Sequence, residues 1–172
     1  NEGMQACGFG QSEYVARDPR WRKSMREWKR TYREWILEAN PDKLIGAPLF
    51  FDLRAIYGQK GLVDELKTDI VDALNVQAMD PDRKFLQMVA AVALEYKPPL
   101  NFFRRFVVER SGDHRHTIDI RDRGTLPVVN AARVLALELR YLESTNTFDR
   151  LQHAAEALPE LSKNLEETLE AY

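Results

Sequence analysis

An aspartate or asparagine followed by proline recurs along the first half of the chain and divides it into helical segments. The pair occurs at Asp18-Pro19, Asn40-Pro41 and Asp80-Pro81. The first residue of such a pair can cap a helix, and the missing N–H of proline costs nothing at the first helical position. We therefore expect a helix to begin at each of these pairs, and the second pair also to end the helix before it.

Apolar residues at helical spacing predict most of the helices. The stripes are Trp21, Met25, Trp28, Tyr32, Trp35 and Ile36; Leu62, Leu66, Ile70 and Leu74; Phe85, Met88, Val89, Val92 and Tyr96; Val128, Ala131, Ala132, Leu135 and Leu139; and Leu161, Leu165 and Leu169. Further helices are expected over 49–57, over 100–109, and over 148–158 with Thr147 as its cap.

Residues 111–123 resist a helical interpretation, and within them Thr117–Ile120 alternates like a short extended segment. The chain has no strand-turn-strand series and no βαβ alternation. It is therefore predicted to be all-α, a bundle of about six to eight helices with one irregular arginine-rich loop.

Composition points to a cytoplasmic protein without a membrane span. The formal net charge of −2 predicts neither nucleic-acid nor membrane binding. Cys7 is the single cysteine, so no intramolecular disulfide can form and a reducing compartment is expected. The longest apolar run, Met88–Leu94, is too short to span a bilayer, and no signal peptide is evident.

No self-sufficient catalytic motif occurs, so no catalytic residue is assigned. A phosphate loop, a dinucleotide-binding glycine motif, a His-Glu-x-x-His pair and a Gly-x-Ser-x-Gly elbow are all missing. Cys7 lies in a segment that resembles a linker and has no evident base partner. His114 and His116 have only Asp113 and Asp119 nearby, so no metal site is predicted.

The segment 97–123 concentrates arginine around a Ser-Gly loop. Its cations are Lys97, Arg104, Arg105, Arg110, Arg115, Arg121 and Arg123, and its acids are Glu109, Asp113, Asp119 and Asp122. Guanidinium groups bind phosphates and carboxylates bidentately, so the loop could clamp an anion. On composition alone, mutual pairing of these charges on a solvated surface is the favoured interpretation.

Two other segments carry charge beside apolar residues. Asp52 and Arg54 lie in a very apolar stretch, and a buried charge requires a partner. A structural ion pair and a polar group lining a cleft remain equally open there. The Trp21, Trp28 and Trp35 stripe is predicted to be core, while its helix also carries Arg22, Lys23, Arg26, Lys29, Arg30 and Arg33.

Together these segments resemble the C-terminal region of a family of bacterial nucleotidyltransferases that often carry cyclic-nucleotide-binding and CBS domains upstream. The matching blocks are Ala16–Met25 with Glu27-Trp28, Phe50–Arg54 with Tyr57-Gly58, Lys97–Leu100 with Phe102-Phe103, Arg105–Gly112, Ile118–Arg121, Ala132–Leu137, and Thr145–Thr147 with Arg150-Leu151. They occur in the family's order and span nearly the whole chain.

The resemblance implies a relation to the PII-protein uridylyltransferases, whose catalytic domain carries a Gly-Ser motif and an Asp-x-Asp pair that binds Mg²⁺. This chain lacks that Gly-Ser motif, and its Asp80-Pro81-Asp82 lies in a different context. The resemblance therefore implies that residues 1–16 are a linker or the tail of a preceding catalytic domain. Residues 17–172 then form the helical substrate-binding domain.

The function expected from this resemblance is accessory. The chain would help to form a cleft for a nucleotide or a protein acceptor, and Mg²⁺ and a nucleoside triphosphate would be needed only by the complete enzyme. Candidate substrate-binding residues are Asp52, Arg54, Arg104, Glu109, Arg110, His116, Asp119 and Arg121. The chain alone is expected to transfer no nucleotide. The alternative is a non-catalytic module for homodimerisation or signal relay, and nucleic-acid binding is disfavoured.

Overall fold

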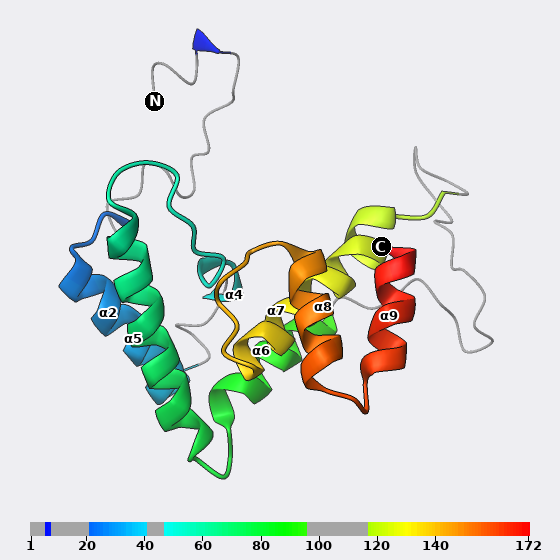
Figure 1. Cartoon of the computed structure of the whole chain (residues 1–172). Helices are drawn as coiled ribbons and strands as arrows, with labels where there is room; N and C mark the ends of the chain where they lie inside the picture. Colours follow the sequence, from blue (N-terminus) through cyan, green and yellow to red (C-terminus); the bar gives the residue numbers. More distant parts are fainter. Residues whose placement is uncertain (1–5, 8–20, 41–46, 96–116) are drawn as a thin grey trace.

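The computed structural model describes residues 6–7, 21–40, 47–95 and 117–172, and the following statements concern these residues. All regular secondary structure within them is helical, which confirms the predicted all-α class (Figure 1). The helices form an elongated array in which α2 and α5 lie at one end and α8 and α9 at the other.

The first long helix, α2 (Met25–Arg33), begins later than predicted. Ser24 is extended, with ψ 162°, and accepts a hydrogen bond from the Glu27 amide while the Glu27 carboxylate accepts one from the Ser24 amide. Such a capping box satisfies two N–H groups at once, and α2 starts there. Asp18-Pro19, where the sequence pattern predicted a helix to begin, lies outside the described residues. The helix continues as a π-helical turn, η2 (Glu34–Glu38), and ends at Ala39 with φ 46°.

The predicted helix over 49–57 is wrong beyond its first residues. Helix α4 (Ala47–Phe50) is a single turn, and residues 51–59 follow without helical structure. Asp52 extends its side chain away from this segment toward arginines far along the chain. A long-range polar contact therefore overrides the local apolar pattern.

Helices α5 (Lys60–Ala78) and α6 (Lys84–Glu95) carry the predicted stripes. The Asp80-Pro81 pair does not cap α6. Instead the Asp80 carboxylate accepts the Asp82 amide at 3.0 Å in a turn, and Arg83 takes a φ of 45° before the helix begins. The sequence pattern therefore predicts helix α6 correctly but places its start three residues too early.

The C-terminal half contains η3 (Arg121–Thr125), α7 (Leu126–Glu138), α8 (Thr147–Ala157) and α9 (Ser162–Ala171). The predicted extended segment at Thr117–Ile120 forms no strand, and Ile120 is already helical. Asn146 rather than Thr147 caps α8, because its side chain accepts the Phe148 amide at 2.8 Å.

Two groups of buried apolar side chains hold the helices together, and we call them the first and second clusters. The first cluster consists of Tyr32, Trp35, Ile36, Phe51, Leu66, Ile70, Ala73, Leu74, Phe85, Leu86, Val89, Leu137 and Leu142. The second cluster consists of Ala132, Leu151, Ala154 and Leu165. Helix α7 contributes to both, so it joins the two halves of the fold.

Candidate functional site

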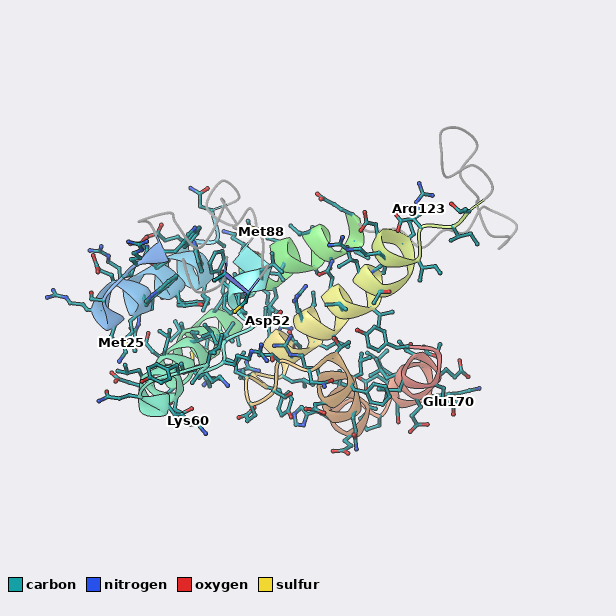
Figure 2. All side chains as sticks on the ribbon, turned by 90° about the horizontal axis from the view of Figure 1, so that it is seen from above. Met25, Asp52, Lys60, Met88, Arg123 and Glu170 are labelled. Atoms are coloured by element: carbon teal, nitrogen blue, oxygen red, sulfur yellow. The ribbon has the colours of Figure 1, made fainter. Side chains whose placement is uncertain are left out.

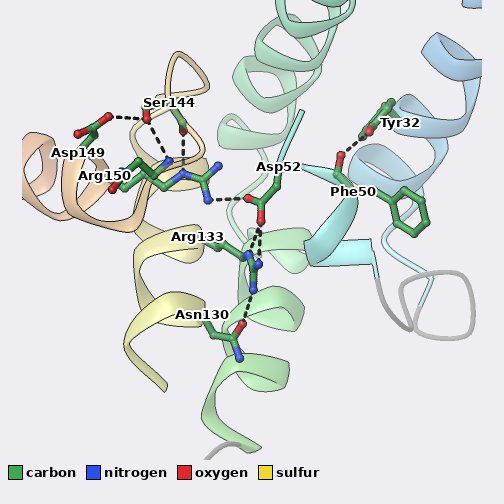
Figure 3. Close-up of polar contacts among 9 residues, drawn as sticks. Tyr32, Phe50, Asp52, Asn130, Arg133, Ser144, Asp149 and Arg150 are labelled. Atoms are coloured by element: carbon green, nitrogen blue, oxygen red, sulfur yellow. Dashed lines mark hydrogen bonds and ion pairs between the residues drawn. The ribbon is translucent and has the colours of Figure 1, made fainter. Parts of the chain in front are cut away.

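Asp52 is the centre of a charged network that lies between the two clusters (Figures 2 and 3). Its Oδ2 accepts hydrogen bonds from Nε and Nη2 of Arg133 at 2.9 and 2.7 Å. Its Oδ1 accepts a hydrogen bond from Nη1 of Arg150 at 2.6 Å. The carboxylate thus connects the segment after α4 with α7 and α8, across 81 and 98 residues of sequence.

Further hydrogen bonds hold each arginine in place. Arg133 Nη1 donates to the Asn130 side-chain oxygen at 2.8 Å, one turn earlier on α7. Arg150 Nε donates to the Ser144 carbonyl at 2.9 Å. The Ser144 hydroxyl in turn donates to the Asp149 carboxylate at 2.6 Å. These hydrogen bonds therefore fix the orientation of both guanidinium groups relative to Asp52.

Burial shows that this network is structural as well as charged. The Arg150 and Arg133 side chains are 4% and 12% exposed, and Asp52 is 23% exposed. A charge so removed from water is tolerated when its partner and its remaining hydrogen bonds are well placed. Of the two interpretations left open for Asp52, the structural ion pair is the one that this geometry supports.

The partners of Asp52 were not identified from the sequence. A buried charge at Asp52 predicts some partner, but Arg133 and Arg150 are remote and lie in helices of ordinary pattern. The one available signal is local: each arginine is next to an apolar residue that packs in the core. Charge at such a position on an amphipathic helix indicates a buried partner.

None of the other candidate residues that the structure describes makes a hydrogen bond or an ion pair with Asp52. Arg54 is exposed in the segment 51–59. The Asp119 carboxylate accepts the Asp122 amide at 2.9 Å and so caps the η3 turn. The Arg121 side chain is 88% exposed, 3.9 Å from the Asp122 carboxylate. Candidates Arg104, Glu109, Arg110 and His116 lie outside the residues that the structure describes.

The tryptophan stripe of α2 is packed in the core, as its spacing predicted. Trp35 is buried, and Trp21 stacks on Phe50 with 4.3 Å between ring centroids. The Tyr32 hydroxyl donates to the Phe50 carbonyl at 2.5 Å, and burial raises the pKa of this phenol. These rings pack α2 against α4 and present no ligand platform.

Part of the basic surface of α2 pairs with acids of α5. Lys29 contacts Glu65 at 2.5 Å, and Arg33 donates to both carboxylate oxygens of Asp69 at 2.9 and 2.6 Å. The hydrogen bond from Arg33 lowers the pKa of Asp69. These contacts pair this part of the basic surface of α2 within the fold.

Within the described ranges, no three His, Cys, Asp or Glu side chains come together as a metal-binding group. No helix among the described residues has the length and apolar character needed to cross a membrane.

Comparison with known proteins gives two family matches. Residues 83–172, more than half of the chain, match the family described as "Putative nucleotidyltransferase substrate binding domain". Residues 1–42, which include α2 and η2, match the family described as "Putative nucleotidyltransferase DUF294". No curated protein and no solved structure matches the chain.

Proposed function

Because the chain belongs to the nucleotidyltransferase substrate-binding family matched by residues 83–172, we propose that it is the helical accessory part of a larger nucleotidyltransferase. The observation that carries this proposal is the order of the two matches, with the nucleotidyltransferase family first and the substrate-binding family second. The catalytic carboxylates would be supplied by a domain that precedes this bundle.

We further propose that the complete enzyme resembles the uridylyltransferases in its chemistry. Transfer of a nucleotide from a triphosphate requires Mg²⁺ held by clustered carboxylates. No such cluster forms among the described residues, so the metal would belong to the preceding domain. The bundle would bind the acceptor or the nucleotide through cationic side chains.

Two of the candidate cations have the exposure that an anion site needs. Arg54 and Arg121 are both exposed, whereas Arg133 and Arg150 are already committed to Asp52. A guanidinium group that faces solvent can form a bidentate contact with a phosphate at little desolvation cost. Arg54 and Arg121 are therefore the described residues to which we assign anion binding.

A transfer assay on two lengths of the protein tests this proposal. The chain of residues 1–172 should transfer no label from ATP or UTP in the presence of Mg²⁺, whereas the longer protein with its upstream coding region should do so. Robust transfer by the shorter chain alone would contradict the accessory role.

Charge removal tests the anion-binding assignment separately. Arg54→Gln and Arg121→Gln in the longer protein should each raise the KM for the triphosphate or for the acceptor about tenfold, because one charge-assisted contact contributes about 1.5 kcal/mol. Arg30→Gln, a matched change of an arginine on α2 whose side chain is 72% exposed, should leave KM unchanged. If KM rises equally in all three variants, Arg54 and Arg121 have no specific role in anion binding.

A further inference from the structure

One end of the bundle exposes large apolar side chains that the fold leaves uncovered. Ile56 is 86% exposed and Tyr57 is 100% exposed, in the segment that follows Asp52. Leu62, in the first turn of α5, is 46% exposed. Scattered exposed apolar residues are ordinary, but adjacent ones on a loop indicate a contact surface.

These residues lie at the end where α2 also begins. Lys29 contacts Glu65 and Arg33 contacts Asp69, four residues farther along each helix, so α2 and α5 run parallel. Their starting residues, Met25 and Lys60, accordingly lie at the same end of the molecule (Figures 1 and 2). The segment 51–59 leads directly into that end of α5.

The same end is where the match to the nucleotidyltransferase family enters the bundle. That match covers residues 1–42, so it includes all of α2 and η2. Tyr32, Trp35 and Ile36 from this region are buried in the first cluster with residues of α5 and α6. The described part of the nucleotidyltransferase match is thus anchored in the bundle by α2, and its residues 21–24 lead into α2 from the exposed end.

Cations outnumber acids at this end. Arg22, Arg26, Arg54 and Lys60 are exposed there. Of the acids, Glu27 and Glu65 contact Ser24 and Lys29, and Asp64 is exposed. An apolar centre with a cationic rim complements a surface that has an apolar centre and acidic rim residues.

We propose that the end formed by Ile56, Tyr57, Lys60 and Leu62 is the docking face for the catalytic domain of the nucleotidyltransferase. The inference rests on the proposed function, since that function supplies the partner. It goes further by assigning the contact to one face: the catalytic domain covers Ile56 and Tyr57 and leaves the opposite end of α5, at Met79, in solvent.

Cysteine labelling in two lengths of the protein tests this face. Cys7 is exposed and is first replaced by serine. Tyr57→Cys and Leu62→Cys then report on the docking face, and Met79→Cys, at a residue 83% exposed, is the matched control. Each variant is made in the chain of 172 residues and in the longer protein, and its rate of reaction with a maleimide is measured.

In the longer protein, the thiols introduced at positions 57 and 62 are expected to react at least about tenfold more slowly than in the shorter chain, because an interface core excludes solvent. The rate at position 79 should change less than about twofold. Equal rates at position 57 in both lengths would overturn the proposal. So would slowing that already occurs in the shorter chain and grows with its concentration, because a second copy would then occupy the face.

A transfer assay on the same longer variants separates this inference from the function. Nucleotide transfer with an unprotected position 57 would overturn the docking face and leave the proposed function standing. Protection of position 57 without transfer of any nucleotide would support the docking face while contradicting the function.

Discussion

Among single residues, Asp52 has a large predicted effect on stability. Asp52→Asn keeps the shape of the side chain but removes the charge that offsets Arg133 and Arg150, which are 12% and 4% exposed. Removing one partner of a largely buried pair destabilises by about 3 kcal/mol. For a chain of this size the midpoint of thermal unfolding should fall by roughly 6–12 °C, measured by circular dichroism.

Asp64→Asn is the matched control for this change. It makes the same chemical substitution at an exposed position of α5, and we expect a shift within about 0.5 kcal/mol. If the two variants unfold at the same temperature, the network around Asp52 does not stabilise the fold.

The sequence predicts that Asp52 has a charged partner, but it does not identify that partner. A charged residue between Phe51 and Leu53 predicts burial and therefore a partner. The identity of that partner depends on how α7 and α8 pack, and the contacts cross 81 and 98 residues. Local patterns carry no information about such distances, so Arg133 and Arg150 could not be assigned to Asp52.

Among the elements, the end of η2 contains a residue in an unfavourable conformation. Ala39 has φ 46° and ψ 49°, a region that costs a residue with a Cβ atom about 1 kcal/mol. Ala39→Gly relieves this strain but loses a methyl group packed against the first cluster. We expect a net stabilisation of roughly 0.5 kcal/mol in urea unfolding.

The same substitution inside a regular helix should lower the free energy of unfolding instead of raising it. Ala131 is exposed within α7, and Ala131→Gly should destabilise by about 1 kcal/mol. A loss of stability in both variants would show that the conformation of Ala39 is not strained.

The stability that the contact between α2 and α5 contributes should depend on pH. Hydrogen bonds from Arg33 lower the pKa of Asp69 in the folded state. The resulting stability is fully present above the pKa of an unfolded aspartate, about 4, and is lost as the pH falls through the lower folded value. Asp69→Asn should therefore cost up to about 1 kcal/mol at pH 7, since the Arg33 side chain is half exposed.

Urea unfolding at a series of pH values measures this effect. The difference in free energy of unfolding between the parent chain and Asp69→Asn should be constant at neutral pH. It should become smaller as the pH falls below about 4. Gln152→Ala, an exposed change on α8 that removes no ionisable group, serves as the control and should show no such narrowing. If this difference in free energy stays constant below about pH 4, the Arg33–Asp69 contact is not its cause.

Sequence patterns identified the helices better than their boundaries. Helices α5, α7 and α9 follow from apolar stripes, because burial of one face selects both the element and its orientation. Helix α2 begins at the Ser24–Glu27 capping box, a signal that the sequence interpretation passed over in favour of Asp18-Pro19. The helix expected over 49–57 fails because Asp52 makes a tertiary contact that no local pattern reveals.

At the scale of the whole molecule, α7 and Asp52 couple the two clusters. Helix α7 places Leu137 in the first cluster and Ala132 in the second. Asp52, next to Phe51 of the first cluster, contacts Arg150 on α8, which packs in the second. Because both connections are buried or partly buried, we expect the described helices to unfold in one cooperative transition.

Leu151→Ala tests this coupling, because the tryptophans all lie in or against the first cluster. Leu151 is 1% exposed in the second cluster, and its truncation should destabilise by about 3 kcal/mol. Trp21, Trp28 and Trp35 are the only tryptophans and pack in or against the first cluster. In a cooperative fold, tryptophan fluorescence and far-ultraviolet circular dichroism should shift together to the same lower urea midpoint.

Gln152→Ala, an exposed change at the next position of α8, should move neither signal. If the two clusters were independent, Leu151→Ala would leave the fluorescence midpoint unchanged and split the circular dichroism curve into two steps. The fluorescence midpoint is therefore decisive. Its shift would mean that the region matched by the nucleotidyltransferase family and the region matched by the substrate-binding family fold as one unit.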